Sequence, residues 1–184
     1  IAITKDDRGL PVVTIIDQTL LPNETKLLHL TALGDLCEAI NSLRIRGAPA
    51  IGCAAAAGVA MAAWRDETTS DAAFIAHLDD AIEHLAATRP TAVNLFWALE
   101  RMKAIVHTGP AQSRFGLAQA LLREAEAIIA DDLARCRMIG RYGERLIKPD
   151  SRILTHCNAG ALATAGYGTA LGVIRAAHQA GRIN

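Results

Sequence analysis

Cys157 is the residue whose type and position best fit a chemical role. It follows Arg152–His156, which predicts a strand, and it begins a tight loop before a predicted helix from Leu162 to Gly181. Open α/β sheets bind ligands where a strand ends and a helix begins, and the helix dipole there favours a thiolate. We therefore expect a reactive thiol at Cys157. A small buried apolar side chain is the alternative role for this cysteine.

Two other segments place an arginine just before a proline near a predicted helix start. In the first, Arg46, Gly47 and Ala48 precede Pro49. Free backbone N–H groups, the helix dipole and a guanidinium could converge there on one anion. In the second, Arg89 precedes a proline before the next helix. Both patterns are compatible with phosphate binding, and spacing alone leaves open ordinary turns between helices with solvated arginines.

Composition and spacing argue against several other kinds of site. Lys plus Arg and Asp plus Glu number 19 each, so the charge gives no reason to expect nucleic acid or a membrane as a partner. The cysteines are far apart and the histidines lack metal-ligand spacing, so we expect no metal. The G-x-G-x-x-x-G run from Gly166 to Gly172 lies within a predicted helix, so we expect no nicotinamide cofactor. Without a signal-peptide pattern, we expect a cytoplasmic protein with reduced thiols.

The elements that must position these residues are mostly helical. Val12–Ile16 predicts a strand, and helices are expected at 31–43, 49–64, 71–89, 91–107 and, after a Gly109-Pro110 break, up to about residue 148. The expected fold class is α/β, with a mixed, mostly helical N-terminal domain (1–110), a long connecting helix (111–150) and the first βα unit of a Rossmann-like domain (151–184). A crossover helix needs a second parallel strand to pack upon. We therefore expect this parallel-sheet domain to be truncated at Asn184.

Four segments together resemble the methylthioribose-1-phosphate isomerase family. They are residues 17–22 (DQTLLP), 46–52 (RGAPAIG), 89–99 and 155–172. The resemblance extends over nearly the whole chain in the expected order. The combination of HCNAG at 156–160 with GYGT at 166–169 is the most specific part, whereas each motif alone is weak.

The resemblance implies a cofactor-independent aldose–ketose isomerase of methionine salvage, a route of methionine and amino-acid biosynthesis, usually a homodimer. It would interconvert 5-methylthioribose 1-phosphate and 5-methylthioribulose 1-phosphate. Arg46, Gly47, Ala48 and Arg89 would bind this sugar phosphate, and Cys157 would act at the reacting carbons or stabilise the transition state. The hydrogen would move as a proton, with Cys157 as base, or as a hydride in a dry pocket.

Family members are about twice this length, and their proton-donating aspartate and a substrate-binding glutamine belong to the second half. We therefore expect the 184-residue chain to be incomplete as an enzyme. Two relatives of the family are alternatives. Ribose-1,5-bisphosphate isomerase would need added positive charge beside the motifs, which we do not find. A regulatory subunit of the translation initiation factor 2B exchange factor would have no need for a reactive thiol beside anion sites.

Overall fold

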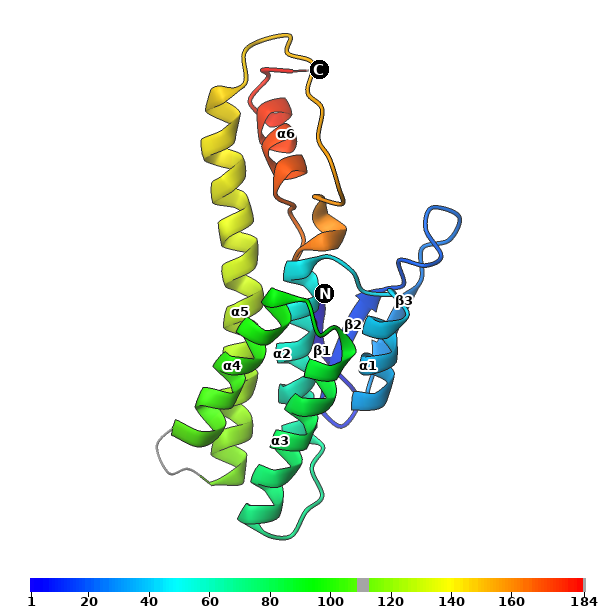
Figure 1. Ribbon diagram of the computed structural model, residues 1–184, viewed down its shortest axis with the longest axis vertical. Helices are drawn as coiled ribbons and strands as arrows, with labels where there is room; N and C mark the ends of the chain where they lie inside the picture. Colours follow the sequence, from blue (N-terminus) through cyan, green and yellow to red (C-terminus); the bar gives the residue numbers. More distant parts are fainter. Residues whose placement is uncertain (109–112, 184) are drawn as a thin grey trace.

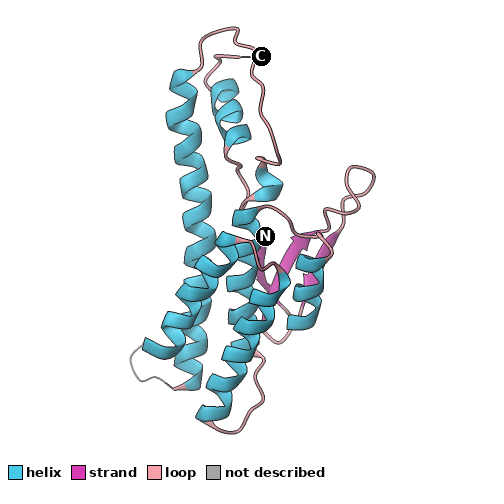
Figure 2. Ribbon diagram, in the orientation of Figure 1, coloured by secondary structure: helices cyan, strands magenta, loops and turns pink. Residues whose placement is uncertain are grey.

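The computed structural model describes residues 1–108 and 113–183. Within them, a small antiparallel sheet precedes a bundle of helices, and a final helix lies along the far half of the longest one (Figures 1 and 2). The elements are β1 (Ala2–Lys5), β2 (Pro11–Ile16), β3 (Leu27–Leu30), α1 (Leu33–Asn41), α2 (Ala48–Trp64), α3 (Asp71–Thr88), α4 (Val93–Thr108), α5 (Arg114–Gly143), the 3₁₀ helices η1 (Glu144–Leu146) and η2 (Ala161–Ala163), and α6 (Ala170–Gln179). The protein is therefore α/β and mostly helical.

The sheet has the strand order β1-β2-β3, with β2 in the centre. Strand β2 pairs with both neighbours in the antiparallel direction. Thr14 lies opposite Ala2 of β1, and Val13 lies opposite Leu30 of β3. The strand predicted at Val12–Ile16 is confirmed as β2, whose β-branched residues are largely buried. Strands β1 and β3 were not predicted, because both are short and mostly exposed and lack a buried apolar run.

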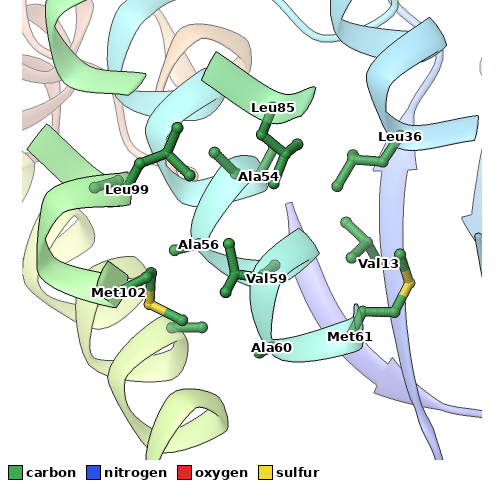
Figure 3. Close-up of a cluster of buried hydrophobic side chains, with 14 of the residues drawn as sticks. Val13, Leu36, Ala54, Ala56, Val59, Ala60, Met61, Leu85, Leu99 and Met102 are labelled. Carbon is green, nitrogen blue, oxygen red and sulfur yellow. The ribbon is translucent and has the colours of Figure 1, made fainter. Parts of the chain in front are cut away.

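Helix α2 forms the centre of the bundle. Every residue from Ala50 to Ala63 is buried, since β2 and helices α1, α3, α4 and α5 all pack against it. A helix that is apolar on all sides is a core helix. Figure 3 shows its small side chains, including Ala54 and Val59, between larger ones such as Leu36, Leu99 and Met102. The neighbouring helices can approach closely because alanine and glycine occupy most of α2.

Helix α5 connects two parts of the molecule. Its first half packs against α2 and α4, and its second half packs against α6 (Figure 1). Gly140 permits this second contact, because a methyl group there would lie 2.9 Å from the carbonyl oxygen of Gly172. The helix ends at Gly143 and continues as η1, somewhat before the predicted end near residue 148. The predicted Gly109-Pro110 break lies outside the described residues.

The strand predicted at Arg152–His156 is wrong. The segment runs without regular structure, and Leu154 is 96% exposed. A strand requires a hydrogen-bonded neighbour, and the sheet found among the described residues is the antiparallel one formed by residues 2–30. The described residues therefore contain no parallel sheet.

The helix predicted from Leu162 to Gly181 is correct only in its second half. Gly166 and Gly168 have φ angles of +155° and +91°, and α6 begins after them at Ala170. The first part contains only the single turn η2, followed by a loop. Apolar spacing continued through both parts, and the glycine backbone overrode it.

Candidate functional site

The Arg46–Ala48 segment forms the start of α2, as the sequence predicted. Gly47 is the N-cap residue, with a φ angle of +101° that favours glycine, and its carbonyl oxygen accepts a hydrogen bond from the Ile51 N–H at 3.0 Å. Arg46 and Ala48 are exposed. An exposed guanidinium beside the N-terminus of a long helix can bind an anion such as a phosphate.

A buried carboxylate holds this segment in place. Asp17, whose side chain is 3% exposed, forms an ion pair with Arg44 and accepts hydrogen bonds from both the hydroxyl and the backbone N–H of Thr19. The Thr19 hydroxyl, together with Arg44, holds the pKa of Asp17 below its ordinary value despite burial. In addition, the Gln18 N–H donates to the Arg44 carbonyl at 3.1 Å. The residues from β2 onward therefore fix the backbone just before Arg46.

The same segment contacts the region that follows Cys157. A methyl group on Gly47 would lie 2.4 Å from the Cα atom of Ala163, so only glycine fits against η2. Gln18, whose sequence separation from Leu162 is 144 residues, donates to that residue's carbonyl oxygen at 2.8 Å. Its Oε1 atom also accepts from Nε of Arg46 at 3.4 Å. Two segments far apart in sequence thus meet in space.

Sequence reasoning gave Asp17 and Gln18 no functional role. Asp17, Gln18 and Thr19 were noted only as a turn after a strand and as part of a family motif. A buried Asp at a strand end, followed by a residue with a hydroxyl, was the available signal for an anchor of this kind.

Cys157 is exposed and has a left-handed backbone conformation, with φ at +68°. Two residues later, the Ala159 carbonyl oxygen accepts hydrogen bonds from the N–H groups of Thr169 at 3.0 Å and Leu171 at 3.3 Å. The helix expected directly after Cys157 is absent, since the α-helix begins at Ala170. The helix-dipole argument for a thiolate therefore has no structural basis here, and exposure is the feature that leaves the thiol available.

Arg89 lies at the C-terminal end of α3, as the residue that caps it. This end of the bundle also contains the starts of α2 and α4, because a methyl group on Gly52 would lie 2.6 Å from the Asn94 carbonyl oxygen. Among the described residues, the buried Nη1 atom of Arg89 has no hydrogen-bond partner. A buried N–H group without a partner is rare in a protein.

Two cavities lie near these segments. One, of about 230 Å³, lies between the starts of α2 and α4 and the middle of α5, and its lining includes Asn94 and Asp132. The other, of about 200 Å³, lies between β2 and the 161–166 segment, and its lining includes Gln18 and Thr164. Neither cavity is lined by Arg46, Arg89 or Cys157. Neither of these two cavities therefore joins the three predicted residues in one pocket.

The remaining cysteines have structural positions. Cys53 and Cys136 are buried and Cys37 is half-buried. Burial raises the pKa of the Cys53 thiol to about 12, so it stays neutral. In residues 1–108 and 113–183, no group of three or more His, Cys, Asp or Glu side chains could hold a metal ion. Over the same residues, none of the helices combines the length and the apolar character needed to span a membrane.

Similarity to known proteins identifies the family of this chain. Residues 44–183 match the model of the initiation factor 2 subunit family. A methylthioribose-1-phosphate isomerase from Roseiflexus sp. (strain RS-1) is 51% identical over 173 residues, which cover 92% of this chain and 49% of the relative. A second isomerase of that name, from Syntrophotalea carbinolica, is 53% identical over 171 residues, or 93% of this chain and 50% of the relative.

Two solved structures are also similar. The 5-methylthioribose 1-phosphate isomerase from Pyrococcus horikoshii OT3 superimposes with a TM-score of 0.90 at 37% identity, over 98% of this chain and 50% of that one. The structure described as translation initiation factor eIF-2B, subunit delta, from A. fulgidus gives a TM-score of 0.84 at 40% identity, over 99% and 52%. The chain therefore spans about half the length of the relatives it matches.

Proposed function

The chain belongs to the initiation factor 2 subunit family. We propose that it is part of an aldose–ketose isomerase that acts on 5-methylthioribose 1-phosphate. The product is 5-methylthioribulose 1-phosphate, and the proposed setting is methionine salvage in the cytoplasm, with the protein acting as a homodimer. The observation that carries the proposal is the contact of Gly47 with Ala163, which joins the Arg46 segment to the segment after Cys157. The similarity to isomerases over most of the chain supports it.

The proposed roles follow from position and charge. Arg46, with the backbone of Gly47 and Ala48 at the start of α2, binds the phosphate. Arg89 offers its unpartnered N–H to another oxygen of the same substrate. The exposed thiol of Cys157 acts at the reacting carbons, C1 and C2 of the sugar. This division gives the two arginines to binding and the thiol to the chemical step.

The domain organisation is part of the same proposal. Residues 1–110 form a substrate-binding domain, 111–150 a connecting helix and 151–184 the beginning of a Rossmann-like domain. The chain spans about half of its relatives' length, which leaves ample sequence in those relatives for the strands of such a domain. In a protein of that length, residues 152–156 would gain hydrogen-bonded strand neighbours, which would explain why they are exposed and unpaired in the described chain.

A protein-binding role like that of an initiation factor 2B subunit is the second candidate, because the A. fulgidus structure is 40% identical to this chain. The isomerase is favoured because the isomerase relatives from Roseiflexus and Syntrophotalea are 51% and 53% identical.

Phosphorus NMR of 5-methylthioribose 1-phosphate tests the proposal. We expect the folded chain to broaden and shift the phosphate resonance, and we expect Arg46→Ala and Arg89→Ala to weaken this effect. Arg8→Ala is a matched control, since Arg8 is exposed in the turn between β1 and β2. A ketose phosphate resonance would report turnover in the same spectra. A resonance that the folded wild-type chain leaves unchanged would contradict the proposed substrate.

A further inference from the structure

Asp132 of α5 is the acidic residue that fastens the segment after Cys157 to the helical bundle. Its Oδ2 atom accepts a hydrogen bond from the backbone N–H of Ala165 at 2.6 Å. Asp132 is half-buried and lines the cavity at the starts of α2 and α4. The proposed function gives it no role. A hydrogen bond from a backbone N–H to a carboxylate is about twice as strong as one between neutral groups.

The Arg46 segment contacts the same turn. Gly47 packs against Ala163, two residues before Ala165. The turn at 163–165 therefore contacts both the start of α2 and the carboxylate of α5. Because both contacts fall on one short piece of backbone, the carboxylate helps to set how this piece lies relative to Arg46.

A continuous set of contacts leads from the turn to Ala159, two residues after Cys157. The buried hydroxyl of Thr164 accepts from the N–H groups of Gly166 at 3.2 Å and Gly168 at 3.0 Å. A methyl group on Gly168 would lie 2.8 Å from the carbonyl carbon of Gly160, so these two strands of the loop are in close contact. The Ala159 carbonyl oxygen in turn accepts from Thr169 and Leu171. The loop from 159 to 169 is thus one closed unit, which contacts α5 through the Asp132 hydrogen bond and through Tyr167, packed beside Gly140.

We infer that Asp132 is a positioning residue for the proposed isomerase reaction. It holds the loop that follows Cys157 in place beside the Arg46 segment. This inference depends on the proposed function only for the meaning of Cys157 and Arg46. The hydrogen bond between Asp132 and Ala165 is a property of the chain itself, and it can be tested without any substrate. Asparagine retains a carbonyl oxygen that can accept from Ala165, whereas alanine retains no acceptor.

A nitroxide spin label on Cys157 reports the position and motion of this loop. The label is attached in a Cys37→Ala background, because the other two cysteines are buried. We expect Asp132→Ala to shorten the rotational correlation time of the label by a few-fold and Asp132→Asn to leave it near that of the background protein. Glu126→Ala, which removes an exposed carboxylate from the same helix, is the control and should change nothing. A spectrum that is the same in Asp132→Ala and the background would overturn the inference.

Amide exchange in the unmodified chain gives a test that does not depend on a variant folding. We expect the Ala165 N–H to exchange about tenfold or more slowly than an unprotected amide, because opening must break a charge-assisted hydrogen bond. Exchange of that amide at the unprotected rate would also overturn the inference. Phosphorus NMR on the same variants separates the positioning role of Asp132 from the proposed isomerase function. If the Asp132–Ala165 hydrogen bond is intact but no substrate binds, only the isomerase function is contradicted.

Discussion

At the scale of residues, Asp17 fixes the backbone that leads to Arg46. Its carboxylate joins the end of β2 to Arg44, two residues before Arg46. Of the two partners, Asp17 is the buried one, with its side chain 3% exposed. Removing one partner of such a pair leaves hydrogen-bonding groups unsatisfied.

Asp17→Ala should lower the free energy of unfolding by about 1–3 kcal/mol at neutral pH, because the Thr19 N–H and Arg44 lose their acceptor. Urea denaturation monitored by circular dichroism measures this. Thr25→Ala serves as a control, because Thr25 is exposed in the same connection between β2 and β3. An unchanged midpoint in Asp17→Ala would contradict the anchoring role.

The pH dependence of stability has a definite sign at Asp17. Its pKa in the folded protein lies below the ordinary value of 3.8, so the unfolded chain binds the proton more readily. The stabilisation is therefore present above that ordinary value and is lost as the pH falls through the lower, folded-state pKa. We expect the free energy of unfolding to fall less steeply below pH ~4 in Asp17→Asn than in the wild type. Equal slopes in the two proteins would show that Asp17 is not a source of the acid sensitivity.

Exposure distinguishes Cys157 from the buried cysteines. In the native chain at pH ~8, we expect iodoacetamide to label Cys157 on the order of 10²-fold faster than Cys53 or Cys136, which react only when the core opens. Burial raises the pKa of the Cys53 thiol to about 12, which further suppresses its thiolate. Peptide mass spectrometry identifies the labelled sites, and labelling in guanidinium is the control. Equal native rates for Cys53 and Cys157 would contradict the described burial.

At the scale of elements, the close approach of α2 and α4 determines where Arg46 and Arg89 lie relative to each other. Gly52→Ala should lower the free energy of unfolding by about 1–3 kcal/mol, because the new methyl group meets the Asn94 backbone carbonyl, which cannot rotate away. Gly34→Ala in α1 is the matched control. A methyl group there meets nothing within 4 Å, so the change should be neutral or stabilising. Urea denaturation of both variants measures the difference, and equal destabilisation would contradict the close packing of α2 and α4.

The elements also show what could be predicted from sequence. The buried helix α2, the amphipathic helices and strand β2 follow from local apolar patterns and proline or glycine positions, and they were predicted nearly to their ends. The 152–156 segment has an equally strong strand pattern but forms no strand, because strand formation depends on a hydrogen-bonded partner elsewhere in the chain. Likewise, the buried hydrogen bonds of Asp17 and Asp132 depend on contacts between distant residues, which spacing along the chain does not reveal.

At the scale of the whole molecule, the proposed substrate-contacting residues come from three places in the sequence. Arg46 precedes α2, Arg89 follows α3, and Cys157 lies beyond α5. Long helix α5 leads from the bundle to the segment that contains Cys157 (Figure 1). Asp132 of α5 accepts a hydrogen bond from Ala165, which follows that segment. The central claim is that these residues contact a single bound sugar phosphate.

Protection of Cys157 by the proposed substrate tests this claim most directly. The rate of Cys157 alkylation is measured in the wild-type chain and in Arg89→Ala, with and without 5-methylthioribose 1-phosphate. Both proteins receive the same ligand concentration, about ten times the Kd of the wild-type chain. We expect the ligand to slow alkylation of the wild type about tenfold, as mass action requires when the thiol lies in the occupied site, and to protect Arg89→Ala much less. If alkylation of Cys157 proceeds at the same rate while phosphorus NMR shows the substrate bound, the thiol and the phosphate site are separate and the account is contradicted.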